Sequence, residues 1–188
     1  DHRTEGMDEE VYKTISLKDL YARTGIQKAI FNTVYQLMAV KKKHPEYLEQ
    51  AETLLHVPDY FHFLLTGEKT CEYTEATTGQ LVCPTTKDWD YELIDMLGYP
   101  KKIFQKLIMP GTSIGHLTDE IKAEVGFDLE VVAPATHDTG SAVLAVPAND
   151  DDFIYISSGT WSLMGIERKE ADCSEKSCEM NFTNEGGY

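Results

Sequence analysis

The chain has 188 residues, of which 41% are hydrophobic and 26% are charged, a composition typical of a folded globular protein rather than a disordered one. It carries 17 basic and 32 acidic residues, a net charge of −15, which argues against nucleic acid and membrane surfaces as partners because both are anionic. The longest apolar stretch, residues 142–148, contains Pro147 and is too short to span a bilayer. No secretory signal is visible, so we expect a cytoplasmic protein whose four cysteines are free thiols.

Short helices are predicted for the first two-thirds of the chain, because polar or proline residues start the segments and glycine or basic residues end them. The predicted helices follow Ser16 up to Gly25, follow Asn32 up to the lysine run 41–43, and span residues 45–50, 58–65, 90–97 and 119–125. We expect Asn32 to cap its helix. Helix 58–65 is strongly apolar and is predicted to be buried, with the aromatic residues from Tyr60 to Phe63 in the core rather than on a stacking platform.

The pattern changes after residue 128. Residues 129–135 are rich in β-branched side chains and are predicted to form a buried strand, and residues 140–146 a helix of small residues packed closely against a neighbour. Two further strands, 153–157 and 161–166, flank a turn with glycine and are predicted to form a β-hairpin. The polar, acidic segment 149–152 is the best candidate for a domain boundary, near residue 150.

Asp138 lies where the predicted strand ends and the predicted helix begins. Ligands of open α/β sheets bind beyond the carboxyl ends of the strands, so an aspartate here is a candidate to accept a proton from a substrate hydroxyl. The alternative is that Asp138 or Thr139 caps the helix, and position alone leaves the two roles equally open. His137 is a candidate to hydrogen-bond a substrate hydroxyl, although a single histidine beside a strand end is more often structural.

The turn at residues 157–160, with the sequence Ser-Ser-Gly-Thr, is rich in hydroxyl and backbone N–H groups. Such turns form nests that bind anions, and a phosphate of ATP is a natural ligand. Many hairpins have Ser-Gly turns, so this signal gains weight only from its position soon after Asp138 and across the predicted junction. A site at a junction closes on two substrates and excludes water.

Three strings around these residues resemble the FGGY family of carbohydrate kinases, and within it the rhamnulokinase branch. They are residues 135–143 (ATHDTGSAV), 156–165 (ISSGTWSLMG) and 181–187 (NFTNEGG). Shorter strings at 1–4, 24–27, 31–37, 58–61 and 72–74 follow in the order that the family shows. The resemblance therefore runs from the first residue to the last, and SSGTWS and NFTNEGG are specific to this branch.

The resemblance implies an α/β fold of the ribonuclease-H-like type, as in actin and hexokinase, with two domains and a cleft between them. Residues 1–150 then form the helix-rich later part of the N-terminal, sugar-binding domain, and residues 151–188 the first strands of the C-terminal, nucleotide-binding domain. We expect the chain to be an internal piece of a longer protein, with the first phosphate loop and the adenosine pocket outside it. The isolated chain is expected to be inactive and to self-associate through unpaired strand edges.

The activity implied by the resemblance is ATP-dependent phosphorylation of a ketose, L-rhamnulose to L-rhamnulose 1-phosphate, with Mg²⁺ required. Matched residue by residue, Asp138 is the proton acceptor and, with His137 and Thr139, contacts the sugar. Thr160 contacts ATP, and no residue of the chain is assigned as a direct metal ligand. Gly140 departs from the alanine that often follows the His-Asp-Thr string, which we expect to be harmless.

Two alternatives stay open at this point. One is a kinase for another ketose or for a polyol. The other is a non-catalytic sugar-binding relative that has kept the fold, although the presence of both Asp138 and Thr160 argues against it.

Overall fold

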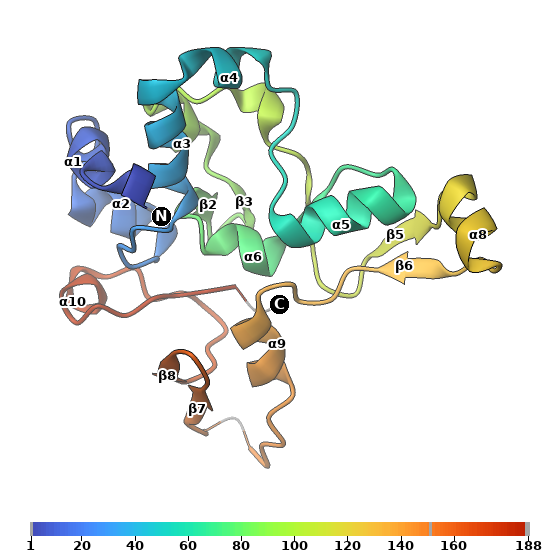
Figure 1. Cartoon of the computed structure of the whole chain (residues 1–188). Coiled ribbons are helices and arrows are strands. Elements are labelled where there is room, and N and C mark those ends of the chain that lie inside the picture. The colour runs from blue at the N-terminus through green and yellow to red at the C-terminus, as the bar shows by residue number, and fades with distance from the viewer. Residues whose placement is uncertain (1, 151, 187–188) are drawn as a thin grey trace.

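The computed structural model describes residues 2–150 and 152–186, which form short helices and two-stranded sheets (Figure 1). The helices are α1 (Met7–Tyr12), α2 (Leu17–Thr24), α3 (Thr33–Lys43), α4 (Pro45–Gln50), α5 (Val57–Thr66), α6 (Tyr73–Thr77), α7 (Tyr91–Met96), α8 (Asp119–Val125), α9 (Asp138–Leu144) and α10 (Glu175–Glu179), with 3₁₀ turns η1 (His2–Thr4) and η2 (Lys101–Ile103). The strands are β1 (Cys71–Glu72), β2 (Val82–Cys83), β3 (Asp88–Trp89), β4 (Leu107–Ile108), β5 (Ser113–His116), β6 (Glu130–Val132), β7 (Tyr155–Ser158) and β8 (Ser162–Gly165). None of the helices in the described ranges has the length and apolar content needed to cross a membrane.

The helix starts and stops follow the local signals in the sequence. Ser16 caps α2 by accepting a hydrogen bond from the N–H of Asp19 (3.1 Å), and Gly25 ends the helix with φ of +69°. Helix α3 has the predicted bounds, but the predicted side-chain cap at Asn32 is wrong. The side chain of Asn32 instead accepts from the N–H of Ala29 (2.5 Å) and donates to the carbonyl of Thr78 (2.7 Å), so it ties the start of α3 to the loop after α6.

The main core lies among α1, α2, α3, α6, α7 and the strand pairs beside them. Its fully buried members include Val11, Leu20, Val34, Tyr35, Leu81, Leu93, Ile94 and Leu97. The hydroxyl of Tyr99 donates to the carbonyl of Val34 (2.7 Å), which satisfies the one polar atom of that buried ring. A second, smaller cluster lies between α5 and the β5–β6 pair.

The prediction that helix 58–65 is buried is wrong for most of its length. Within α5 only Asp59 and His62 are buried, and Phe61 is 59% exposed. One face of α5 packs on β5 and β6, and the opposite face points away from the rest of the chain (Figure 1). The apolar sequence of α5 therefore reflects a two-sided helix whose second side is uncovered in this chain.

Four strand pairs replace one continuous sheet among the described residues. β1 pairs in parallel with β4, whereas β2–β3, β5–β6 and β7–β8 are antiparallel. The predicted buried strand 129–135 is corrected to the shorter β6, of which only Val131 is buried, because β6 lies in a two-stranded sheet with one covered face. Ala133 and Ala135, beyond the strand, are buried as well.

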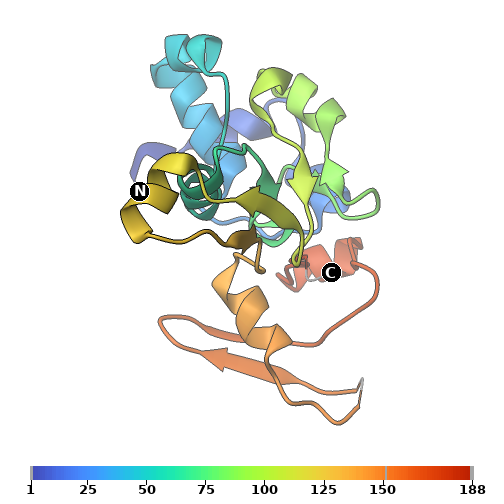
Figure 2. The same cartoon turned by 90° about the vertical axis from the view of Figure 1, so that its right-hand side faces the viewer.

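Below this body lie α9 and the β7–β8 hairpin (Figures 1 and 2). The hairpin is confirmed, with Ser158 opposite Ser162 at its closed end. Helix α9 begins at Asp138 rather than at Gly140. It contacts β7, but the expected close packing is not found, because none of its residues is buried. After the hairpin the chain returns to the body, where α10 packs on α2.

Candidate functional site

Asp138 is the first residue of α9, and its side chain is 98% exposed. Its Oδ1 accepts from the N–H of the next residue, Thr139 (2.7 Å), and lies 3.9 Å from Nε2 of His137. The position before the helix belongs to His137, whose side chain makes no capping hydrogen bond. Asp138 therefore does not cap α9 from the preceding position, and its carboxylate is exposed to solvent at the start of the helix.

His137 lies between two parts of the chain that are far apart in sequence. Its N–H donates to Oγ1 of Thr74 (3.2 Å), in α6, and its Nδ1 lies 3.2 Å from Oε2 of Glu185. Burial raises the pKa of Glu185, and the neighbouring His137 opposes that shift. Nδ1 has no hydrogen-bond partner among the described residues, so Glu185 lies beside the imidazole without a directional bond, and Nε2 lies on the side of Asp138.

Glu72, at the end of β1, is fully buried and caps α6. Its carboxylate accepts from the N–H (2.9 Å) and the hydroxyl (2.5 Å) of Thr74 and from the N–H of Glu75 (3.2 Å). It also accepts from the N–H (3.0 Å) and the hydroxyl (2.8 Å) of Thr136. One buried carboxylate thus joins the start of α6 to the residue that precedes His137.

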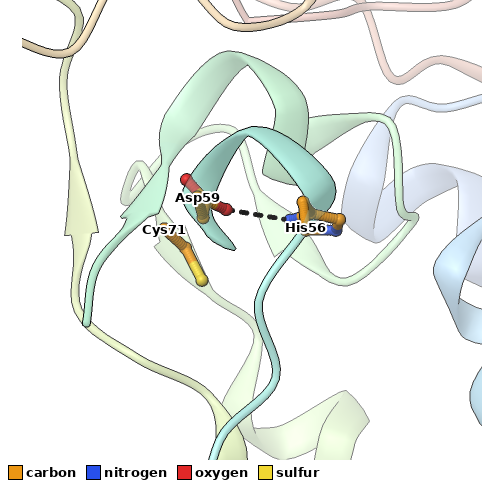
Figure 3. Close-up of side chains that lie close together, drawn as sticks. All are labelled: His56, Asp59 and Cys71. Carbon is orange, nitrogen blue, oxygen red and sulfur yellow. Dashed lines mark ion pairs between the residues drawn. The ribbon is translucent and has the colours of Figure 1, made fainter. Parts of the chain in front are cut away.

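Next to Glu72 in the fold is a small polar cluster of His56, Asp59 and Cys71 (Figure 3). The side-chain atoms of these residues that could bind a metal ion lie within 4.8 Å of one another. Oδ1 of Asp59 accepts from the N–H of Glu72 (2.9 Å), and Oδ2 faces Nδ1 of His56 at 3.4 Å. Burial raises the pKa of the Cys71 thiol, whose Sγ lies 3.5 Å from the carbonyl oxygen of Leu54. The arrangement suits a buried carboxylate with an adjacent imidazole as its partner.

The segment 172–186 is held against the body mainly by Asn184. Its backbone N–H and its Nδ2 both donate to the carbonyl of Gly25 (2.9 Å each). Within the segment, its Nδ2 also donates to the carbonyl of Asp172 (3.1 Å) and its Oδ1 accepts from the N–H of Asp172 (2.8 Å). The hydroxyl of Tyr21 donates to the carbonyl of Phe182 (2.9 Å), and the N–H of Gly186 donates to Oγ1 of Thr77 (3.0 Å). These bonds place Glu185 beside His137.

Substitution of Gly25 by Ala is expected to destabilise the chain more than the same change at Gly126. Both glycines end a helix with positive φ, +69° and +83°, so each substitution brings a left-handed strain of about 1–2 kcal/mol. A Cβ at Gly25 would in addition lie 2.9 Å from Sγ of Cys173 and 3.1 Å from Cβ of Asn184, whereas one at Gly126 meets open space. The difference between the two urea midpoints measures how firmly segment 172–186 is docked, and equal midpoints would contradict the docking.

Thr160 lies exposed in the turn between β7 and β8. The N–H of Gly159 donates across this turn to the carbonyl of Trp161 (2.7 Å), so that N–H group is turned into the hairpin. The Trp161 ring meets the ring of Phe31 edge to face, with centroids 6.3 Å apart. Within the described residues, His137, Asp138 and Thr139 thus lie together at the start of α9. Thr160 lies on a separate turn, next to the Trp161 ring that contacts Phe31.

Sequence reasoning missed the supporting carboxylates. Glu72 and Glu185 each belong to strings that carry the family resemblance, yet no role followed from those strings. Both residues act through long-range contacts, to Thr136 and to His137, which no local pattern reveals. Thr74 and Thr136 are common residue types and carry no sequence signal of their own. The fold places both beside Glu72, where they form a hydrogen-bond network.

The fold is similar to that of solved sugar kinases. A gluconate kinase from Lactobacillus acidophilus superposes with a TM-score of 0.76 at 24% sequence identity, over 87% of this chain and 34% of that one. The mixed helix-and-sheet fold predicted for a sugar kinase is therefore confirmed.

The family model of the FGGY family of carbohydrate kinases, N-terminal domain, matches residues 1–145, and the chain belongs to this family. The chain is 54% identical over 187 residues to a rhamnulokinase of Halalkalibacterium halodurans and 52% identical to one of Oceanobacillus iheyensis. Each match covers all of this chain and 40% of the relative, so the chain spans well under half the length of the curated relatives it matches.

Proposed function

We propose that the whole protein to which this chain belongs transfers the terminal phosphoryl group of ATP to L-rhamnulose, giving L-rhamnulose 1-phosphate and ADP. The observation that carries this proposal is the similarity to rhamnulokinases along the full chain, at 54% identity in the first case. The exposed carboxylate of Asp138 at the start of α9 also supports the proposal, because it is a group that can accept the proton of a sugar hydroxyl.

In this reaction Asp138 orients the primary hydroxyl of the sugar and accepts its proton as the bond to phosphorus forms. Its Oδ2 is suited to that role because Oδ1 is already occupied by the N–H of Thr139. His137 and Thr139 flank the carboxylate and supply groups that hydrogen-bond the sugar hydroxyls. Phosphoryl transfer has a loose transition state, so correct positioning contributes much of the rate.

Mg²⁺ suits this site because the exposed oxygen of Asp138 is of the kind that the ion prefers, together with water and substrate phosphates. Asp138 would hold the ion through a water molecule. When bound, Mg²⁺ neutralises charge on the phosphates of ATP.

Thr160 is proposed to contact a phosphate of ATP, since it lies exposed in a turn that offers hydroxyl groups. With it we propose the domain division near residue 150, residues 1–150 belonging to the sugar-binding domain and residues 151–188 to the nucleotide-binding domain. The family model for the N-terminal domain ends at residue 145, which supports this division. The exposed apolar side chains of the hairpin, such as Ile156 and Trp161, support self-association of the isolated chain.

The test is a phosphorylation assay of the whole protein with ATP, Mg²⁺ and a panel of L-rhamnulose, D-xylulose, L-ribulose and glycerol. We expect the highest kcat/KM for L-rhamnulose. A higher value for another sugar or polyol would reassign the substrate, and sugar binding without ADP release would identify a non-catalytic relative. The isolated chain of 188 residues serves as a further sample and is expected to release no ADP.

A further inference from the structure

We propose that Glu72 is a positioning residue for Asp138, and that Asp59 holds Glu72 in place by accepting a hydrogen bond from its backbone N–H. The inference rests on the proposed function for its kinetic consequence and on the geometry of the chain for its structural one. Neither carboxylate touches the exposed face of Asp138. They act through the backbone of Thr136 and His137.

The first step is the placement of Asp138 itself. Among residues 2–150 and 152–186, the side chain of Asp138 has hydrogen bonds and an ion pair only with its sequence neighbours Thr139 and His137. Its position is therefore set by the backbone immediately before α9. That backbone is anchored at Thr136, which bonds Glu72, and at His137, which bonds Thr74.

The second step is that these two anchors share one carboxylate. Oγ1 of Thr74 donates to Oε2 of Glu72 and accepts from the N–H of His137, while Thr136 gives both its N–H and its hydroxyl to the same Oε2. Glu72 is fully buried, so water cannot replace these bonds. The other oxygen, Oε1, accepts from the N–H of Thr74 (2.9 Å), so both oxygens of Glu72 are used. A glutamine at this position has one acceptor oxygen and would leave one of the two sets of donors unpaired.

The third step is the support of Glu72 by Asp59. The two residues lie on α5 and β1, and Oδ1 of Asp59 accepts from the N–H of Glu72 at 2.9 Å. Asp59 is itself fully buried, and its second oxygen faces His56 (Figure 3). Two buried carboxylates in series thus connect α5, β1 and α6 to the residues that carry the proposed chemistry.

The test substitutes Thr136 rather than the buried glutamate alone. Thr136→Val keeps the branched shape and removes the hydroxyl that donates to Glu72, and Thr136→Ser restores that hydroxyl. Thr66→Val is the matched control, because Thr66 is also part-buried and donates to a backbone carbonyl, that of His62 (2.8 Å), within α5. Glu72→Gln is the stronger companion variant.

The first readout needs no activity. Amide hydrogen exchange of the isolated chain is expected to accelerate at Thr136 and His137 in Thr136→Val and Glu72→Gln, and to stay unchanged there in Thr136→Ser and Thr66→Val. Unchanged protection at residues 136 and 137 in both Thr136→Val and Glu72→Gln would overturn the proposal. If Glu72→Gln does not fold, the Thr136 series decides alone.

The second readout is kinetic, in the whole protein. We expect Thr136→Val to lower kcat by ~10-fold to ~10²-fold with little change in the KM for ATP, because misplacement of a reacting group by 1 Å costs up to about 10²-fold. Thr136→Ser should recover most of this loss, and Thr66→Val should match the wild type. An active wild type with an unimpaired Thr136→Val variant would refute the positioning role, whereas an inactive wild type would refute the proposed function and leave the exchange result standing.

Discussion

Substitution of Asp138 by Asn in the whole protein is expected to reduce kcat by ~10²-fold to ~10⁴-fold, the contribution typical of a positioned general base. The amide keeps the size of the carboxylate and its hydrogen bond from Thr139, but it cannot take up the proton of the sugar hydroxyl. Because Asp138 is 98% exposed, the change should leave the fold intact. Sugar affinity, measured calorimetrically, is expected to change much less than kcat.

The matched control for this substitution is Asp119→Asn. Asp119 is likewise the first residue of a short helix, α8, and is fully exposed, so both variants lose the same favourable charge at a helix start. Their thermal midpoints should therefore agree, while only Asp138→Asn loses turnover. Near-normal kcat for Asp138→Asn would remove Asp138 from the mechanism, and an equal loss for Asp119→Asn would point to a nonspecific charge effect.

Local features of the fold were predictable because they depend on residues close in sequence. Ser16 and Gly25 bound α2 as expected, and a two-strand pattern around Gly159 gave the hairpin. Burial was harder to predict, as α5 and β6 show. An apolar sequence indicates that a segment has hydrophobic side chains to bury. Whether they are buried depends on neighbours from other parts of the chain, and Phe61, for example, stays exposed.

The residues of the candidate site differ in the same way, since some follow from local patterns and others only from long-range contacts. Asp138 and His137 stood out because a strand-to-helix junction is a local pattern. The role of Glu72 did not, because its partner Thr136 is 64 residues away and the bond exists only once β1 and the segment before α9 are side by side. Glu185 meets His137 in the same way, only after the hairpin and α10 have brought the chain back to the body.

Asp59→Ala is expected to destabilise the chain by about 3 kcal/mol, measured as the free energy of unfolding in urea. The variant leaves the N–H of Glu72 buried without an acceptor and removes the carboxylate that faces His56. Asp59→Asn keeps an acceptor for that N–H, so its loss should be smaller, about 1 kcal/mol. Asp19→Ala is the control, because Asp19 occupies the same third position in α2 but is exposed.

A double-mutant cycle separates the two contributions of Asp59. If the pair with His56 contributes, His56→Ala and Asp59→Ala together should destabilise less than the sum of the single variants, by about 0.5 kcal/mol or more. An additive result would assign the whole effect to the bond with Glu72 (2.9 Å). A loss for Asp59→Ala no larger than that for Asp19→Ala would mean that Glu72 does not depend on α5, and the support of Asp138 would then end at Glu72 itself.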